Sequence, residues 1–457
     1  MQAEEFLTLN KEQMLEDLAA LVEIESVEGP PEPGAPFGRG PRRALDKALE
    51  TARRLGLHTQ DGDGYLGWAQ AGGLEEEGPY LASITHLDVV PAGSGWTGDA
   101  FSLRRREGVL LGRGVSDDKG PAVLMLYAAK YLQQEGLLRY PFRVLLGCNE
   151  ETGMKDVPYY LARQPQPAFL FSPDGEFPVC NGEKGIYTAV LEARQPKESR
   201  LVSFWGGSAA NMVPDRAKAV IRMDGLPPAC EGIKAEQTPE GLVRLEAFGV
   251  GGHAAMPQGT CNAIGLLAGY LEKENLLCPH EQLYFSLLRR LFASFDGGGL
   301  GLAFEQAPFT PLTCVGSMMR LEKGRYRQTL NIRYPAGITG EELTRRLEKA
   351  AAGAACVKDI ENDPPFYISA ENPAIDTLLR AYSSRTGKPA QPFTMGGGTY
   401  ARHFKNAVSF GMEQPKELLP PFAGPIHGAD EALGEDWFFD AFLVYADAAA
   451  ALQKLKF

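Results

Sequence analysis

The sequence predicts an α/β protein in which a mostly parallel sheet, covered by helices, is interrupted by an inserted α+β domain with an antiparallel sheet. Three observations support this fold class. Between about residues 80 and 176, continuous apolar runs alternate with a helical pattern, which favours parallel strands buried on both faces. From about Gly185 onward, apolar and polar residues alternate, as in antiparallel strands with one solvated face. At about residue 370 a long helical pattern returns.

The first segment is predicted to alternate strands and helices. An amphipathic helix over about Lys11–Ile24 precedes a loop over 28–43, and apolar strands lie within 80–90, 142–150 and 168–176. The helix between the first two strands has Pro121 in its first turn and stops at Gly136, which are favourable end signals.

The middle segment is predicted to contain strands within 216–225, 242–252 and 325–337 and helices over 262–274 and 340–351, with a surface loop at 296–304. A further helix is expected within 372–387. These changes of pattern predict a discontinuous domain, 1–185 with 370–457, and an inserted domain, 186–369.

Composition excludes several classes of protein. The 457 residues are 44% apolar and carry a net charge of -12, with no basic stripe for nucleic acid. Seven cysteines without a CxxC pair indicate reduced thiols. The polar, acidic N-terminus predicts no signal peptide, and no apolar run approaches the ~20 residues of a membrane helix. A cytoplasmic protein is expected.

Side chains of the kinds that bind metals follow the apolar strands. In open α/β sheets, ligands bind beyond the carboxyl ends of the strands. The candidates are His86 and Asp88 in "THLDVV", Asp117 in "GRGVSDDKG", Glu150 and Glu151 in "NEETG", Asp174 in "FSPDGE" and His427 in "PIHGADE".

Each of these motifs has an ordinary structural interpretation when taken alone. "THLD" suits a polar turn, "SDDKG" a helix N-cap with acids at the positive end of the dipole, and "NEETG" an exposed loop. "SPDG" is a turn signal. A single histidine such as His427 is usually a surface or core residue.

Their combination indicates a two-metal site. Three carboxylates and two imidazoles form a mixed oxygen and nitrogen set suited to zinc, manganese or cobalt. Five ligands exceed the usual four of one zinc ion and suit two ions that share a bridging carboxylate. Asp88 shares a strand face with His86 and can accept its other ring N–H. Glu150 is then free to act as a general base on the attacking water.

Six motifs together resemble the dinuclear zinc peptidase family, which includes carnosinases, aminoacylases, glutamate carboxypeptidases and succinyl-diaminopimelate desuccinylases. They are "HLDVVPAGSGW", "GRGVSDDKGP", "NEETG", "FSPDGEFPVCNGEKG", "GGSAANMVPD" and "NIRYP". The resemblance covers nearly the whole chain in order, and within the family it is greatest to bacterial dipeptidases.

The resemblance implies two Zn2+ ions per chain, with Mn2+ or Co2+ as alternatives. His86 and Asp174 would hold one ion, Glu151 and His427 the other, and Asp117 would bridge them.

The resemblance also implies supporting roles around the metals. Asp88 supports His86, and Glu150 is the catalytic base. The Asp117–Asp118 peptide bond is expected to be cis, and an Asp at position 174 is similar to the aminopeptidase-like branch of the family.

The middle segment resembles the family's lid domain. His253 would donate a hydrogen bond to the developing oxyanion, Arg333 would grip the substrate's C-terminal carboxylate, and Asn211 would assist binding. Backbone N–H groups at Gly397 and Gly398 could receive a carboxylate. On pattern alone, Arg333 is one more strand arginine and His253 a loop histidine.

The resemblance therefore implies a zinc dipeptidase that cleaves dipeptides with a free N-terminus and has no nucleic-acid or membrane partner. The size of the inserted domain predicts a monomer. An amidohydrolase acting on N-acyl amino acids is the nearest alternative. A non-catalytic metal- or peptide-binding homologue is a third, which the retained base Glu150 argues against.

Overall fold

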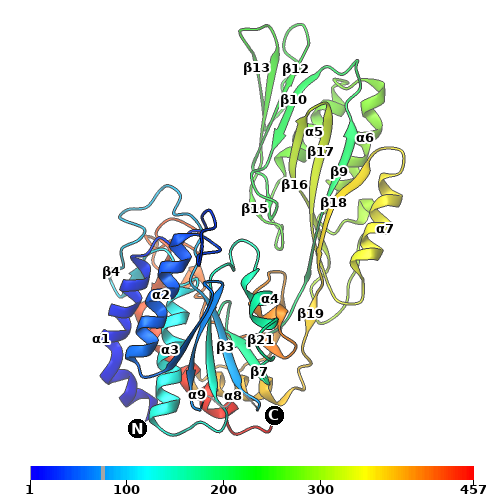
Figure 1. Cartoon of the computed structure of the whole chain (residues 1–457). Coiled ribbons are helices and arrows are strands. Elements are labelled where there is room, and N and C mark those ends of the chain that lie inside the picture. The colour runs from blue at the N-terminus through cyan, green and yellow to red at the C-terminus, as the bar shows by residue number, and fades with distance from the viewer. Residues whose placement is uncertain (1, 74–77) are drawn as a thin grey trace. The chain divides into compact units, whose positions relative to one another are not determined.

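The computed structural model describes residues 2–73 and 78–457, and the chain forms two compact units. The first unit comprises Met1–Asn181, Ile368–Phe393 and Thr399–Phe457, and the second comprises Gly182–Tyr367 and Thr394–Gly398 (Figure 1). The short segment Thr394–Gly398, which includes Gly397 and Gly398, thus packs with the second unit rather than with the residues around it. One reason is that the Lys184 backbone N–H donates to the Met395 carbonyl.

The sheet of the first unit is mixed. Its strand order is β1-β2-β6-β3-β7-β21-β8, the order continues into β19, and β20 pairs with β8; β19 and residues Thr394–Met395 of β20 are counted with the second unit. The strands are β1 His58–Gly62, β2 Leu66–Ala71, β3 Leu81–His86, β6 Phe142–Gly147, β7 Phe169–Ser172, β8 Cys180–Glu183, β19 Phe366–Tyr367, β20 Phe393–Met395 and β21 Ala407–Ser409. The four neighbours β6, β3, β7 and β21 are parallel, while β1, β2 and β8 pair antiparallel with their neighbours.

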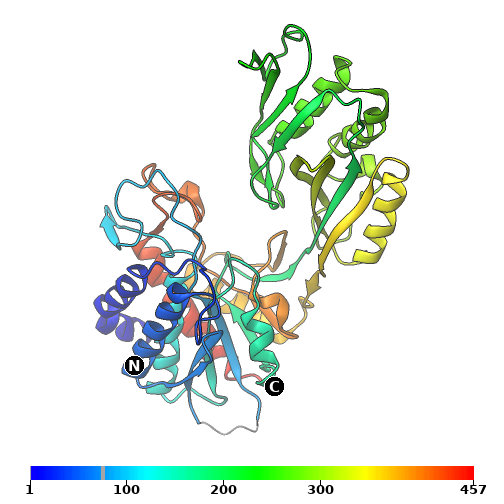
Figure 2. The same cartoon turned by 45° about the horizontal axis from the view of Figure 1, so that its top comes forward.

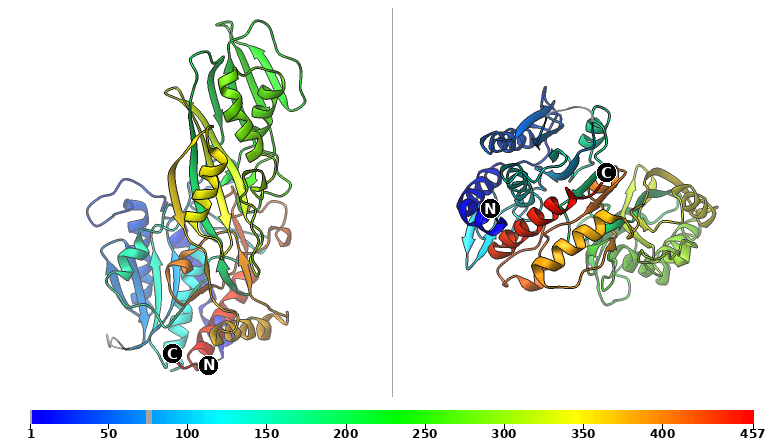
Figure 3. Two further views of the ribbon diagram at one scale, coloured as in Figure 1. Left: turned by 90° about the vertical axis from the view of Figure 1, so that its right-hand side faces the viewer. Right: turned by 90° about the horizontal axis from the view of Figure 1, so that it is seen from below.

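Helices cover this sheet. They are α1 Ala3–Val22, α2 Arg39–Arg54, α3 Lys119–Gln134, α4 Asp156–Leu161, α8 Pro373–Thr386 and α9 Glu435–Leu452, with short 3-10 turns η2 Tyr400–His403 and η3 Lys416–Leu418. Helix α3 lies against β2, β3 and β6, and α9 packs on α1, α3 and α8. Figure 3 shows α8 and α9 side by side. A small sheet, β22-β5-β4, is formed by β4 Arg104–Arg106, β5 Val109–Leu111 and β22 Ala432–Gly434.

The second unit is an antiparallel sheet in the order β13-β14-β12-β10-β16-β17-β9-β18. The strands are β9 Gly185–Arg194, β10 Leu201–Gly206, β12 Arg216–Ile221, β13 Ile233–Gln237, β14 Val243–Phe248, β16 Thr313–Glu322, β17 Arg325–Tyr334 and β18 Cys356–Asp363. A two-stranded ribbon joins β11 Met212–Val213 and β15 Gly252–His253.

Three helices lie along one face of the second sheet (Figure 2). They are α5 Ala263–Lys273, α6 Pro279–Leu291 and α7 Gly340–Ala351, and a 3-10 turn, η1, covers Gly298–Leu300. Tyr187, Ala189 and Leu191 alternate along β9 and are buried beneath these helices, so the period-two pattern of the sequence marks the covered face.

The predicted fold class is confirmed, but two details of the prediction are wrong. The first helix begins at Ala3 rather than near Lys11, and α2 begins at Arg39, inside the predicted loop 28–43. The loop predicted at 296–304 contains η1. Helices α6 and α9 are additional to the prediction. Among the described residues, no helix is both long and apolar enough to cross a bilayer.

Candidate metal centre

The carboxylate of Asp117 lies between two imidazoles. Its Oδ1 is 2.8 Å from His86 Nε2, and its Oδ2 is 2.9 Å from His427 Nε2. His427 Nε2 is also 3.2 Å from Glu151 Oε2. Each oxygen of Asp117 therefore faces a different histidine, which is the arrangement that a bridging ligand requires.

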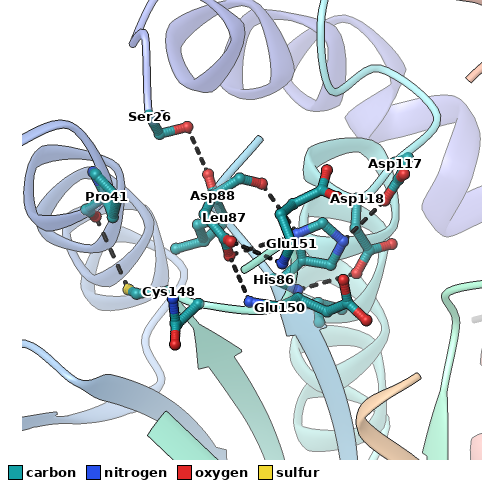
Figure 4. Close-up of polar contacts among 12 residues, drawn as sticks. Ser26, Pro41, His86, Leu87, Asp88, Asp117, Asp118, Cys148, Glu150 and Glu151 are labelled. Carbon is teal, nitrogen blue, oxygen red and sulfur yellow. Dashed lines mark hydrogen bonds and ion pairs between the residues drawn. The ribbon is translucent and has the colours of Figure 1, made fainter. Parts of the chain in front are cut away.

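The fold brings these residues together because parallel strands end at one edge of the sheet. His86 is the last residue of β3 and pairs with Gly147, the last residue of β6. The loop after β6 carries Glu150 and Glu151, and β7 ends two residues before Asp174. Figure 4 shows His86, Asp117 and the two glutamates gathered where β3 and β6 end.

Two overlapping sets of side chains have the geometry to hold a metal ion. One is His86, Asp117 and Glu151, and the other is His86, Glu150 and Asp174; within each set the ligand atoms lie within 4.8 Å of one another. Imidazole and carboxylate donors suit zinc, manganese or cobalt. The donors thus fit a metal of this kind, and Glu150 lies among the candidate ligands.

A hydrogen bond fixes the orientation of His86. Its Nδ1 lies 2.9 Å from the backbone oxygen of Asp88. Because a carbonyl oxygen only accepts, Nδ1 carries a proton, and Nε2, which lies 2.8 Å from Asp117 Oδ1, is the ring nitrogen that would bind a metal after losing its own proton.

Asp88 contacts the loop of the paired glutamates more closely than it contacts the imidazole. Its Oδ1 is 3.6 Å from His86 Nδ1, whereas its two oxygens accept the backbone N–H groups of Glu150 and Glu151 at 3.1 and 3.0 Å. The sequence predicts that the Asp88 carboxylate accepts the ring proton. In the structure the backbone oxygen of the same residue does so, and the carboxylate holds the loop in place.

Burial and like charges raise the pKa values of two carboxyl groups. Burial, together with the negative charge of Asp174, raises the pKa of Glu150 well above its usual range. Burial, followed by the charge of Asp117, raises the pKa of Asp174 to about 8. Crowded carboxyl groups of this kind are stabilised by a bound cation.

Hydrogen bonding acts in the opposite direction at Asp117 and His427. Burial would raise the pKa of Asp117, but hydrogen bonds from His427 and His86 outweigh it and hold this pKa well below its usual range. Burial would lower the pKa of His427, but hydrogen bonds to Asp117 and Glu151 raise it to about 11. Metal binding here must therefore displace protons.

The peptide bond between Asp117 and Asp118 is cis, as the sequence resemblance implied. Asp118 occupies the N-cap position of α3, but its carboxylate makes no capping bond. Its Oδ2 instead accepts the backbone N–H of His86 at 3.0 Å. Asp118 therefore occupies the N-cap position that "SDDKG" suggests, but its side chain binds the backbone of His86 instead of capping the helix.

A cavity of about 360 Å³ adjoins the Asp117 and His427 loops. Its lining includes Ser116, three acidic residues and one lysine: Glu176, Glu413, Glu417 and Lys416. Burial, followed by the charges of Glu176 and Asp117, raises the pKa of Glu413 to about 7. The cavity is suited to a positively charged group.

The predicted residues of the middle segment gather within the second unit. His253 pairs with Met212 on the β11–β15 ribbon, and the Ala254 N–H donates to the Asn211 carbonyl at 2.8 Å. His253 Nδ1 accepts the N–H of Ala255 at 3.2 Å. Because Nδ1 accepts, Nε2 carries the proton and is a hydrogen-bond donor.

Arg333 lies on β17 close to the same ribbon. Its Nε donates to Asn331 Oδ1 at 2.9 Å and its Nη1 to the Gly396 carbonyl at 3.0 Å. The paired strand contributes Thr313, whose hydroxyl donates to the Ala254 carbonyl at 3.1 Å. Arg333 thus lies near the glycine segment that includes Gly397 and Gly398.

A protein-family model, peptidase family M20/M25/M40, matches residues 82–451 of the chain. The match includes all of the residues that form the candidate metal centre. The chain belongs to peptidase family M20/M25/M40. Members of this family are metal-dependent peptidases, so the prediction that the chain is a metallopeptidase is confirmed.

Named relatives cover the chain from end to end. A Beta-Ala-Xaa dipeptidase of Lactobacillus delbrueckii subsp. lactis is 31% identical, over 98% of this chain and 98% of the relative. A putative dipeptidase, YtjP, of Bacillus subtilis (strain 168) is 31% identical, over 97% of this chain and 98% of the relative.

Solved structures show the same fold. An M20 family metallo-carboxypeptidase from Sulfolobus solfataricus superposes with a TM-score of 0.59 at 14% identity, covering 97% of this chain and 99% of that one. Human carnosine dipeptidase 1 gives a TM-score of 0.57 at 15% identity, covering 99% of both chains. The fold is thus that of family M20/M25/M40.

Four residues at the site are not among the candidates predicted from the sequence: Arg113, Glu431, Glu176 and Glu413. Glu431 accepts the backbone N–H of Asp117 and pairs with Arg113. Arg113 and Glu431 were visible only as parts of the motifs "GRGVSDDKG" and "PIHGADE". Each is a charged residue inside a motif that also contains a predicted metal ligand, and this position could have marked it as a candidate. Glu413 lies in none of these motifs.

Proposed function

We propose that this protein is a dinuclear metal-dependent dipeptidase that cleaves dipeptides with a free N-terminus. The observation that carries the proposal is the position of Asp117, whose two carboxylate oxygens face His86 and His427 separately. Dipeptidase names among relatives that are 31% identical over nearly the whole chain support the same substrate class.

We assign the first metal to His86 and Asp174 and the second to Glu151 and His427, with Asp117 shared. Zinc is the proposed metal, and manganese and cobalt fit the same donors. When bound, such ions supply a Lewis acid and lower the pKa of water.

Glu150 is the proposed general base. Its carboxylate accepts a proton from the water whose oxygen attacks the scissile carbonyl carbon. As the C–N bond breaks, the same carboxyl passes the proton to the leaving amine. Asp88 assists by accepting a hydrogen bond from the Glu150 backbone N–H. This bond fixes the position of the backbone that carries the Glu150 side chain. Since Glu150 also lies among the candidate ligands, its substitution must be read together with the metal content.

The residues of the second unit are assigned to the substrate itself. His253, whose Nε2 is a donor, would stabilise the oxyanion that forms at the attacked carbonyl. Arg333 would bind the C-terminal carboxylate, because a guanidinium pairs with a carboxylate through two parallel hydrogen bonds. Asn211 and the N–H groups of Gly397 and Gly398 would assist this binding.

The cavity lined by Glu176 and Glu413 is the proposed site for the free amino group. Two carboxylates near Asp117 and Ser116 would neutralise an ammonium group placed beside the scissile bond. An N-acetylated substrate has no such charge. The cavity therefore favours the dipeptidase over the amidohydrolase that acts on N-acyl amino acids.

The test combines metal analysis with a substrate panel on the purified protein. The panel contains a β-Ala dipeptide, an ordinary α-dipeptide and the N-acetylated form of each. We expect two metals per chain and turnover of at least one free dipeptide, with little turnover of the acetylated forms. Preferential hydrolysis of the acetylated forms would show an amidohydrolase, and a metal content near one per chain would overturn the dinuclear centre.

A further inference from the structure

A fully buried ion pair lies behind the candidate metal centre. Arg113 Nη1 is 2.7 Å from Glu431 Oε2, and both side chains have an exposed fraction of 0%. Arg113 belongs to the loop before α3, and Glu431 lies 318 residues later in the chain. The pair therefore joins the segment of Asp117 to the segment of His427.

Glu431 also binds the backbone of the Asp117 loop directly. Its Oε1 accepts three N–H groups, from Gly114 at 3.1 Å, Ser116 at 3.1 Å and Asp117 at 3.3 Å. Three donors converging on one oxygen fix the course of this loop. The last of them belongs to the residue proposed to bridge the metals.

Arg113 binds the other ligand segments. Its Nη2 lies 3.4 Å from the carbonyl oxygens of Pro91, Ala92 and His427. Pro91 and Ala92 follow the β3 strand that ends in His86. The guanidinium carbon Cζ of Arg113 also lies over the Trp96 ring, 5.2 Å from the ring centroid.

The backbone at His427 shows why such a contact matters. His427 has φ of +62°, in the left-handed region that residues other than glycine seldom adopt. The Arg113 hydrogen bond is made to the carbonyl of this residue. The pair therefore contacts a residue that holds a disfavoured backbone conformation.

We infer that Arg113 and Glu431 are positioning residues that set the spacing of Asp117 and His427 and thereby determine the affinity of the metal that these two residues share. The inference rests on the proposed function, since it takes both residues as metal ligands. Neither Arg113 nor Glu431 contacts substrate in this role. They act through backbone atoms of the ligands.

A general stabilising role is the alternative. Buried ion pairs contribute little net stability on average, because desolvation offsets their attraction. A purely structural pair would alter the melting temperature and leave the metal affinities as they are. Metal affinity is therefore the measurement that separates the two roles.

The experiment is a calorimetric titration of metal-free protein with Zn2+, using wild type, Glu431→Gln and Arg113→Lys. Gln keeps an oxygen that can accept the three N–H groups but removes the charge. Lys keeps the charge but loses the planar fork. We expect the metal shared by Asp117 and His427 to bind about ten to a hundred times less tightly in both variants.

Kinetics provide a second measurement. At saturating Zn2+ we expect kcat to return toward wild type with KM unchanged, because the variants alter metal occupancy and not substrate contacts. The control is the surface pair of Arg105 and Glu435, in which Nε and Nη2 of Arg105 donate to the two Glu435 oxygens at 2.9 and 2.5 Å. Arg105→Lys and Glu435→Gln should bind both metals as wild type does.

A double variant guards against loss of folding. Arg113→Gln combined with Glu431→Gln leaves no single buried charge behind. Wild-type affinities for both metals in a cooperatively folded Glu431→Gln or double variant would overturn the inference while leaving the proposed function standing. Failure of the wild type itself to bind two metals would instead refute the proposed function.

Discussion

The candidate metal centre of the first unit and the substrate-binding group of the second unit are built differently. In the first unit, buried carboxylates accept backbone N–H groups beside the ligands: Asp88 holds Glu150 and Glu151, Asp118 holds His86, and Glu431 holds Asp117. In the second unit, His253 lies on a ribbon of two short strands whose neighbours Met212 and Met256 are exposed.

This difference suits the two tasks. A metal centre requires its ligands at fixed spacing, so each ligand loop is tied by side chains from elsewhere in the chain. A group that binds different dipeptides must adapt to their side chains, and a short ribbon with exposed neighbours can do so. We therefore expect substitutions of the metal ligands and of the residues that hold them to act through metal content, and substitutions in the second unit to act through kcat or KM alone.

The largest effect is expected for Asp117→Asn. An amide cannot bridge two cations as a carboxylate does, so both metals should be weakened. We expect kcat/KM to fall about a thousandfold or more, since several kcal/mol of transition-state stabilisation are lost. Metal analysis should show fewer than two ions per chain. Full metal content with normal turnover would remove Asp117 from the bridging position.

His253→Ala should lower kcat about a hundred- to a thousandfold, the usual effect of removing one oxyanion donor. Metal content and the melting temperature should remain those of the wild type, because His253 lies in the second unit. Measurement of kcat alongside metal content tests this directly. A loss of metal in His253→Ala would contradict the separation of roles between the two units.

The comparison also shows how much could be predicted from the sequence. The positions of His86, Asp117, Glu151 and Asp174 follow from apolar strands that end in metal-binding side chains, and the structure brings these residues within ligand distance. The pairing of Arg113 with Glu431 could not be predicted, because two residues 318 positions apart leave no periodic signal.

The missed elements have physical reasons as well. Helix α9 is buried on nearly all sides, from Phe438 to Leu452, so its apolar residues show no single face. Helix α6 begins at a capping box in which Cys278 takes the place of the usual Ser or Thr. Segment Thr394–Gly398 joins the second unit through contacts that only the folded chain reveals.

A smaller effect is expected for Arg333→Lys. A lysine cannot present two parallel N–H groups to a carboxylate, so KM should rise about ten- to a hundredfold while kcat changes little. Arg327→Lys on the same strand is the matched control, because Arg327 pairs with Glu192 and Asp359 instead. Steady-state kinetics on one free dipeptide provide the measurement, and an equal rise in KM for both variants would argue against a specific carboxylate contact.

The smallest effect is a pH dependence confined to the metal centre. Burial and the charge of Asp117 raise the pKa of Asp174 to about 8 in the metal-free protein, so this carboxyl is largely protonated at pH 7. A metal binds the deprotonated form, and binding must release that proton. Metal affinity should therefore rise with pH. Below pH 8, deprotonation of Asp174 should raise the affinity about tenfold per pH unit, and above pH 8 this group should have no further effect.

Competition with a chelator of known affinity, measured between pH 6 and 9, gives the slope of the logarithm of metal affinity against pH. His427, whose pKa is raised to about 11, contributes a proton across the whole interval, so the contribution of Asp174 is seen as a decrease in slope near pH 8. Asp174→Asn should bind metal more weakly and lose that decrease. A break that persists in Asp174→Asn would assign it to another carboxyl group of the site, with Glu150 the first to examine because burial also raises its pKa.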